Sequence, residues 1–146
     1  MRLITDPRLK TWFVGFSDET TSSHSLWYES LLAKGFKHCY AFAWDEKAAV
    51  WILYDPGWES ICVRAMTMER AERFFTEIKG RDIILECTVK SEPGFYSRIF
   101  HTCATAVAYL VGVNIFFPPS VYALYCALRK TDAKVSFLSR PLDKEY

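Results

Sequence analysis

The sequence predicts an α+β fold in which a small antiparallel sheet packs against helices. Two observations lead to this expectation. Runs rich in aromatic and β-branched residues, separated by short turns, fill much of the first part of the chain and are typical of strands. Apolar residues at helical spacing dominate the last part. Because most strands precede most helices, an antiparallel sheet with helices beside it is favoured over an alternating α/β arrangement.

Composition predicts one well-packed domain. The chain has 146 residues, of which 51% are hydrophobic and 16% aromatic, enough for a single buried core. We expect one domain over residues 1–130 and a charged, loosely attached C-terminal tail over residues 131–146. Eighteen basic and seventeen acidic residues leave a formal charge of +1. Such a balance gives no field to hold a nucleic-acid backbone, so nucleic-acid binding is not expected.

The N-terminal residues 1–7 lack the apolar run and cleavage site of a secretory signal. The longest apolar stretch, residues 104–117, contains Gly112 and Asn114 and is too short to span a bilayer. The five cysteines are odd in number and are not spaced as in a zinc ribbon or a redox pair. We therefore expect no membrane span, a cytoplasmic location and free thiols that mostly serve as small core residues.

The first strand is expected at residues 11–17, whose sequence TWFVGFS is aromatic and β-branched. Residues 18–25 are rich in capping and turn residues and predict a polar loop. A short helix over residues 26–34 would follow and end at Gly35.

Two strand-like runs come next, residues 36–44 and 48–55, and the three residues between them suit a hairpin. A turn at Pro56-Gly57 then leads to a third strand of this group at residues 61–65.

Thr67 is the expected N-cap of a helix that ends at Gly80, with an apolar face formed by Met68, Ala71, Phe74, Phe75 and Ile78. Residues 82–90 alternate between apolar and polar side chains and predict another strand. Two helices finish the domain. The first is expected over residues 103–111, and the second opens with Pro118-Pro119-Ser120.

Cys103 is the candidate nucleophile. It follows Thr102, a possible N-cap, so its amide would lie in the first helical turn, where free N–H groups favour a thiolate or an oxyanion. The structural alternative is a core thiol packed among the apolar residues of the same helix. A helix that starts earlier, capped by Ser97, would place Cys103 in mid-helix and remove the dipole argument.

His38 is the candidate base, because it interrupts an apolar strand where a solvated histidine is not expected. With Glu46-Lys47 as a two-residue turn, His38 lies directly opposite Asp55, on one face of the sheet. The carboxylate could then fix the tautomer of the ring and stabilise the imidazolium. A one-residue change in the loop would instead place His38 opposite Tyr54 or Pro56. A satisfied core histidine and an Asp-Pro-Gly turn are the corresponding structural alternatives.

His101 is a rival base, although neighbours only two residues from Cys103 usually point elsewhere. We expect His101 to line the site and Trp58 to form a wall of the substrate groove. A zinc site formed by His38, Cys39, His101 and Cys103 is disfavoured, because adjacent strand residues face opposite sides. No cofactor is implied, since cysteine acyl transfer needs none.

Three segments, Gly35-Phe36-Lys37-His38-Cys39, Trp51-Ile52-Leu53-Tyr54-Asp55-Pro56 and Thr102-Cys103, resemble permuted papain-like (NlpC-like) cysteine hydrolases. More narrowly, they are similar to small papain-like proteins encoded by tailed phages. The resemblance covers about residues 27–129, and in that family the histidine strand precedes the cysteine helix.

The resemblance implies a papain-like fold with a catalytic triad in which Cys103 is the nucleophile, His38 the base and Asp55 the orienting residue. It implies a thiol protease or amidase that acts on peptide or cell-wall peptide substrates, in the host cytoplasm or in the virion. The alternative is a non-catalytic structural or assembly protein of a phage particle or tail, whose partner is another phage structural protein. A regulatory domain with an incidental His/Asp pair is a third reading.

Overall fold

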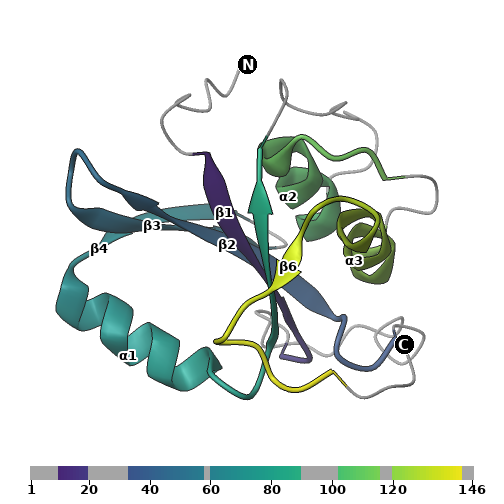
Figure 1. Cartoon of the computed structure of the whole chain (residues 1–146), viewed down its shortest axis with the longest axis horizontal. Helices are drawn as coiled ribbons and strands as arrows, with labels where there is room; N and C mark the ends of the chain where they lie inside the picture. The colour runs from purple at the N-terminus through teal and green to yellow at the C-terminus, as the bar shows by residue number, and fades with distance from the viewer. Residues whose placement is uncertain (1–9, 20–32, 58–59, 90–101, 116–119, 143–146) are drawn as a thin grey trace.

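The computed structural model describes residues 10–19, 33–57, 60–89, 102–115 and 120–142. Within these residues the chain is α+β, as expected, with an antiparallel six-stranded sheet in the order β4-β3-β2-β1-β5-β6 and three helices (Figure 1). The elements, in chain order, are β1 (Thr11–Ser17), β2 (His38–Asp45), β3 (Val50–Pro56), β4 (Ile61–Met66), α1 (Met68–Ile78), β5 (Ile83–Thr88), α2 (Cys103–Val111), α3 (Val121–Arg129) and β6 (Lys134–Val135).

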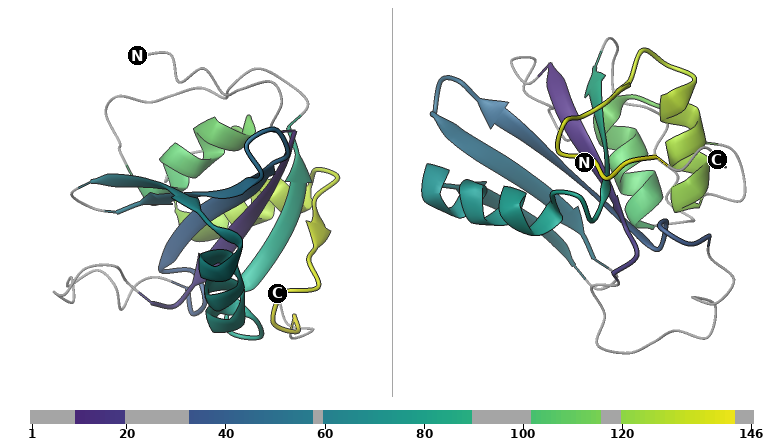
Figure 2. Two further views of the ribbon diagram at one scale, coloured as in Figure 1. Left: turned by 90° about the vertical axis from the view of Figure 1, so that its left-hand side faces the viewer. Right: turned by 60° about the horizontal axis from the view of Figure 1, so that its bottom comes forward.

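The helices cover both faces of the sheet. The two views in Figure 2 place α2 and α3 together on one face and α1 on the other. Two separate apolar clusters fill the spaces between sheet and helices: a larger one that includes residues of α2 and α3, and a smaller one that includes Ile78 of α1. The sheet is therefore the middle layer of the domain.

The alternation of β2 shows how the sequence builds these two layers. Cys39, Ala41 and Ala43 belong to the cluster under α2 and α3, whereas Tyr40 and Phe42 belong to the cluster under α1. Successive side chains of a strand point to opposite faces, so a central strand covered on both sides is apolar throughout. This is why residues 39–44 of β2 form a continuous apolar run.

The β2–β3 hairpin differs from its predicted register. The observed pairs, such as Phe42 with Leu53 and Asp45 with Val50, are shifted by two residues from the expected ones. The loop has four residues, because the Asp45 carboxylate accepts the amides of Lys47 and Ala48 and Ala49 adopts a positive φ of 51°. A two-residue turn needs positive φ at both central positions, which Glu and Lys do not favour.

Residues 131–146 were expected to form a loose tail, and this expectation is wrong for the described part of it. β6 pairs with β5, and Ser136 and Leu138 are buried. The amide of Gly80 donates to the Leu138 carbonyl (3.3 Å), and that of Arg140 donates to the Asp82 carbonyl (2.8 Å). These backbone bonds attach the segment to the sheet edge despite its charged composition.

Among the described residues, the helices lack the length and hydrophobicity that a membrane span requires. The predicted helix over residues 26–34 falls almost entirely outside the described residues, and so does the turn at Pro118-Pro119.

The Tyr40 ring lies over Gly15 of the neighbouring strand β1, and its hydroxyl reaches the buried carboxylate of Asp82. Its hydroxyl donates to Asp82 (2.6 Å), which is 1% exposed, and the Arg81 guanidinium donates to the same carboxylate (2.9 Å). A Cβ at Gly15 would lie 2.2 Å from the Tyr40 ring. Glycine is therefore required at this strand position by the close approach of the ring.

We expect Gly15→Ala to lower the free energy of unfolding by about 1–3 kcal/mol, because the tyrosine must move away from Asp82. Urea unfolding followed by circular dichroism measures the change. In a Tyr40→Leu background, which lacks the clashing ring atoms, the same glycine substitution should cost much less. An equal cost in both backgrounds would contradict this account of Gly15.

Candidate active site

His38, Asp55 and Cys103 come together where three elements end or begin. His38 is the first residue of β2, Asp55 is the last but one of β3, and Cys103 is the first residue of α2. His38 is buried, whereas Asp55 and Cys103 are partly exposed. The site therefore lies at the end of the sheet, beside the N-terminus of a helix.

His38 and Asp55 are joined by a direct hydrogen bond, with 2.7 Å between Nε2 and Oδ1. The two-residue turn predicted that the two residues lie directly opposite each other, and they do not. Tyr54 pairs with Ala41, so extending the ladder by one residue brings Asp55 opposite Tyr40 and diagonal to His38. A shift of two residues keeps every side chain on its face, and a diagonal pair is within reach of these side chains.

Asp55 fixes which nitrogen of His38 can serve the thiol. Because Nε2 is bonded to the carboxylate, Nδ1 is the ring atom left to interact with Cys103. Burial lowers the pKa of His38, but hydrogen bonds to Asp55 and Cys103 and the charges of both outweigh it and raise the pKa from 6.5 to about 9. At neutral pH the ring is an imidazolium.

The sequence around Cys103 sets the helix start. Thr102 is the N-cap of α2, and a reciprocal capping box joins it to Thr105, with each side chain accepting the other residue's amide. The Ala106 amide donates to the Thr102 carbonyl. Cys103 is thus the first helical residue of α2, as predicted, and does not lie in mid-helix. The first-turn amides of Cys103 and Ala104 lie next to the thiol.

The pKa of Cys103 lies well below its ordinary value. A hydrogen bond from the Cys39 thiol lowers it most, burial opposes this, and the hydrogen bond and charge of His38 lower it further, as does the backbone of Cys39. The opposite shifts of His38 and Cys103 favour a thiolate–imidazolium pair, the state in which a cysteine is nucleophilic at neutral pH.

Cys39 is a member of this site that the sequence analysis assigned to the core. Its thiol is fully buried, and burial followed by contact with Cys103 raises its pKa well above the ordinary value. It stays protonated and can donate to the Cys103 thiolate. His38 and Cys39 leave the strand on opposite sides, and both nevertheless lower the pKa of Cys103. Alternation along β2 indicates that Cys39 faces the helix layer, but it does not indicate that Cys39 lies beside Cys103.

Trp58 and His101, the two predicted substrate-binding residues, lie outside the described residues. The choice between His101 and His38 as the base therefore stays a prediction. Within the part of the chain that the structure describes, no three His, Cys, Asp or Glu side chains are grouped as a metal ion would require.

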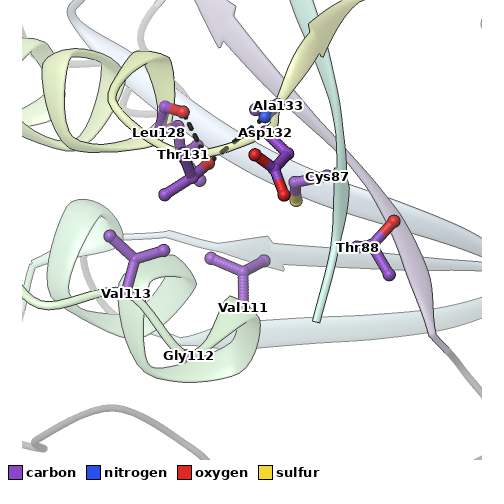
Figure 3. A pocket seen from close by; sticks show the side chains of 9 residues that line it. All are labelled: Cys87, Thr88, Val111, Gly112, Val113, Leu128, Thr131, Asp132 and Ala133. Carbon is purple, nitrogen blue, oxygen red and sulfur yellow. Dashed lines mark hydrogen bonds between the residues drawn. The ribbon is translucent and has the colours of Figure 1, made fainter. Parts of the chain in front are cut away.

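Two cavities lie away from these residues. A groove of about 760 Å³ on the α1 face is lined by aromatic side chains, including Phe13, Trp44 and Trp51. A smaller one of about 280 Å³ lies between β5 and the C-terminal ends of α2 and α3 (Figure 3). Cys87 borders it, but burial and the charge of Glu86 raise the pKa of this thiol to about 12. Neither cavity is lined by the His38–Cys103 group.

Comparison with protein-family models, with curated proteins and with solved structures finds no match to this chain.

We expect iodoacetamide to alkylate Cys103 at about pH 6, below the ordinary thiol pKa of about 8.5, because its thiolate is already formed. Mass-spectrometric peptide mapping after timed labelling measures the rate. In His38→Ala the loss of the imidazolium should slow labelling at this pH by about tenfold or more.

Cys87 serves as the internal control in the same samples, since its raised pKa keeps it protonated. Equal labelling of Cys103 and Cys87, unaffected by His38→Ala, would contradict the thiolate–imidazolium pair.

Proposed function

We propose that this chain is a cysteine hydrolase or acyl transferase of the permuted papain-like (NlpC-like) type, acting on amide bonds. The observation that carries the proposal is the contact of Cys103, His38 and Asp55, with the pKa of the thiol lowered and that of the ring raised. Support also comes from the chain order, histidine strand before cysteine helix, and from the short segments that resemble the family.

In the proposed mechanism the Cys103 thiolate attacks the amide carbonyl carbon and forms a tetrahedral oxyanion. The His38 imidazolium then protonates the leaving nitrogen as the C–N bond breaks, which leaves a thioester on Cys103 and a neutral ring. The neutral ring takes a proton from water as the water oxygen attacks the thioester. Release of the acid restores the thiolate and the imidazolium. An amine attacking in place of water would give acyl transfer.

Two groups support the reacting atoms. The first-turn amides of Cys103 and Ala104 are positioned to donate to the oxyanion, where the helix dipole also favours negative charge. Asp55 holds the His38 ring through Nε2, so that Nδ1 stays directed toward the sulfur. The site needs no group beyond these side chains and water.

The resemblance to papain-like proteins of tailed phages supports peptide or cell-wall peptides as the substrate class and a phage as the source. The location would then be the host cytoplasm or the virion.

A second candidate is a non-catalytic structural or assembly protein on the same fold, for example a component of a phage particle or tail. Two exposed apolar side chains on one face of the edge strand β4 favour it: Val63 is 60% exposed and Ile61 43%. Side chains of this kind on a surface are typical of protein contacts when they are clustered. The reactivity of Cys103 separates the two candidates, since an assembly role requires no acidic thiol.

We expect the wild-type chain to release new amino groups from purified cell-wall peptides or a mixed peptide library, and Cys103→Ala to release none. Liquid chromatography with mass spectrometry detects the products, and an acid quench preserves the acyl thioester on Cys103. Cys126→Ala, a substitution on α3, is the matched control and should keep full activity. Turnover retained by Cys103→Ala would rule out the proposed nucleophile.

The pH profile gives a second expectation. Because the imidazolium donates the proton and its pKa is raised to about 9, the rate should fall as pH rises through about 9. Asp55→Asn removes a charge that raises this pKa, so the alkaline limb should move to lower pH. An alkaline limb that stays in place in Asp55→Asn would argue against the orienting role of the carboxylate.

A further inference from the structure

The site contains two neighbouring thiols beside one apolar cluster, and the hydrolytic mechanism uses only one of them. Cys39 projects from β2 into the layer under α2, where it is fully buried in the apolar cluster. Cys103, at the first position of α2, packs against the same cluster, and the Cys39 thiol is the group that lowers its pKa most. Hydrolysis requires the Cys103 nucleophile but no second cysteine beside it.

The two thiols differ in accessibility. Cys103 is partly exposed and its pKa is lowered, so a small oxidant reacts first with this thiol. Cys39 is shielded from solvent and stays a thiol, so it is protected from direct oxidation but adjacent to the sulfur that is oxidised. This is the arrangement of a reactive cysteine beside a resolving one.

We propose that Cys103 and Cys39 form a redox pair in which hydrogen peroxide converts the two thiols reversibly into a disulfide. The Cys103 thiolate attacks one peroxide oxygen and the O–O bond breaks. The sulfur becomes a sulfenic acid, and the departing oxygen takes a proton and leaves as water. The Cys39 sulfur then attacks the sulfenic sulfur, the S–O bond breaks, and a second water leaves with the proton of the Cys39 thiol.

The disulfide would block the nucleophile without destroying it. A thiol reductant returns both sulfurs to the reduced state, whereas a sulfenic acid without a neighbouring thiol goes on to sulfinic and sulfonic acids that do not return. The pair therefore protects Cys103 during oxidative exposure. The proposal needs only the reactive thiol and its neighbour, and it holds whether or not the chain cleaves amides.

The other described cysteines are less suited to resolve Cys103. Cys87 lies on β5, separated from β2 by β1, and its thiol donates to the Trp12 carbonyl at 3.4 Å. Cys62 is on the edge strand β4 and Cys126 is on α3. Cys39 is the cysteine that acts on the pKa of Cys103.

The test treats the reduced full-length chain with hydrogen peroxide, blocks remaining thiols, and maps the products by mass spectrometry. We expect loss of two hydrogen atoms in the intact mass, a Cys39–Cys103 disulfide peptide, and recovery of Cys103 labelling after dithiothreitol. In Cys39→Ser, which keeps a hydrogen-bond donor, Cys103 should gain two or three oxygen atoms and recover less than about a tenth of its labelling. Cys126→Ser is the matched control and should behave as wild type.

Absence of the Cys39–Cys103 peptide in the oxidised wild-type chain would overturn the proposal, and this readout does not depend on any variant folding. Equal recovery of Cys103 labelling in wild type and Cys39→Ser would also overturn it. The hydrolysis assay on reduced protein is separate, so failure of the redox pair and failure of the hydrolase proposal are told apart.

Discussion

The His38 ring is held between a carboxylate and a thiol, and the arrangement of the neighbouring elements serves this contact. The β2–β3 ladder brings Asp55 within 2.7 Å of Nε2. The capping box of α2 makes Cys103 the first helical residue. If the ladder slipped by one residue, Asp55 would move to the other face of the sheet. If the helix began elsewhere, the thiol would leave both the ring and the first-turn amides.

Burial makes this contact demanding. His38 is only 7% exposed, and burial by itself lowers the pKa of the ring, which disfavours its charge. The charged ring is retained because Asp55 and Cys103 both supply hydrogen bonds and negative charge. The imidazolium and the Cys39 thiol in turn stabilise the Cys103 thiolate. Removing any one partner would leave another with a charge that burial opposes, so the groups are expected to act as a unit.

Much of the fold could be predicted from the sequence because periodicity reports burial directly. The strand at residues 11–17 and the helix at residues 103–111 match β1 and α2. The antiparallel α+β class is confirmed. The hairpin register was wrong because the loop depends on the Asp45 side chain and on the positive φ of Ala49, which a turn-length argument does not include. The residues expected as a tail pair through backbone groups, which composition does not reveal.

The candidate site was only partly predictable. Alternation predicted that His38 and Asp55 lie on one face of the sheet. This prediction holds although the predicted register was wrong, because a shift of two residues leaves each side chain on its face. Thr102 before an apolar run indicated the helix start at Cys103. The contact of Cys39 with Cys103 depends on how α2 lies over β2, a tertiary fact that no local pattern carries. Trp58 and His101 stay predictions, since they lie outside the described residues.

The central claim is that His38 is charged at neutral pH because Cys103 and Asp55 hold it so. A pH titration of the histidine ring signals by NMR, with His38 assigned through His38→Gln, tests this directly. The account predicts that His38 titrates near pH 9 in the wild-type chain and at clearly lower pH in Cys103→Ala. Titration near the ordinary histidine value of about 6.5, unchanged by Cys103→Ala, would contradict it.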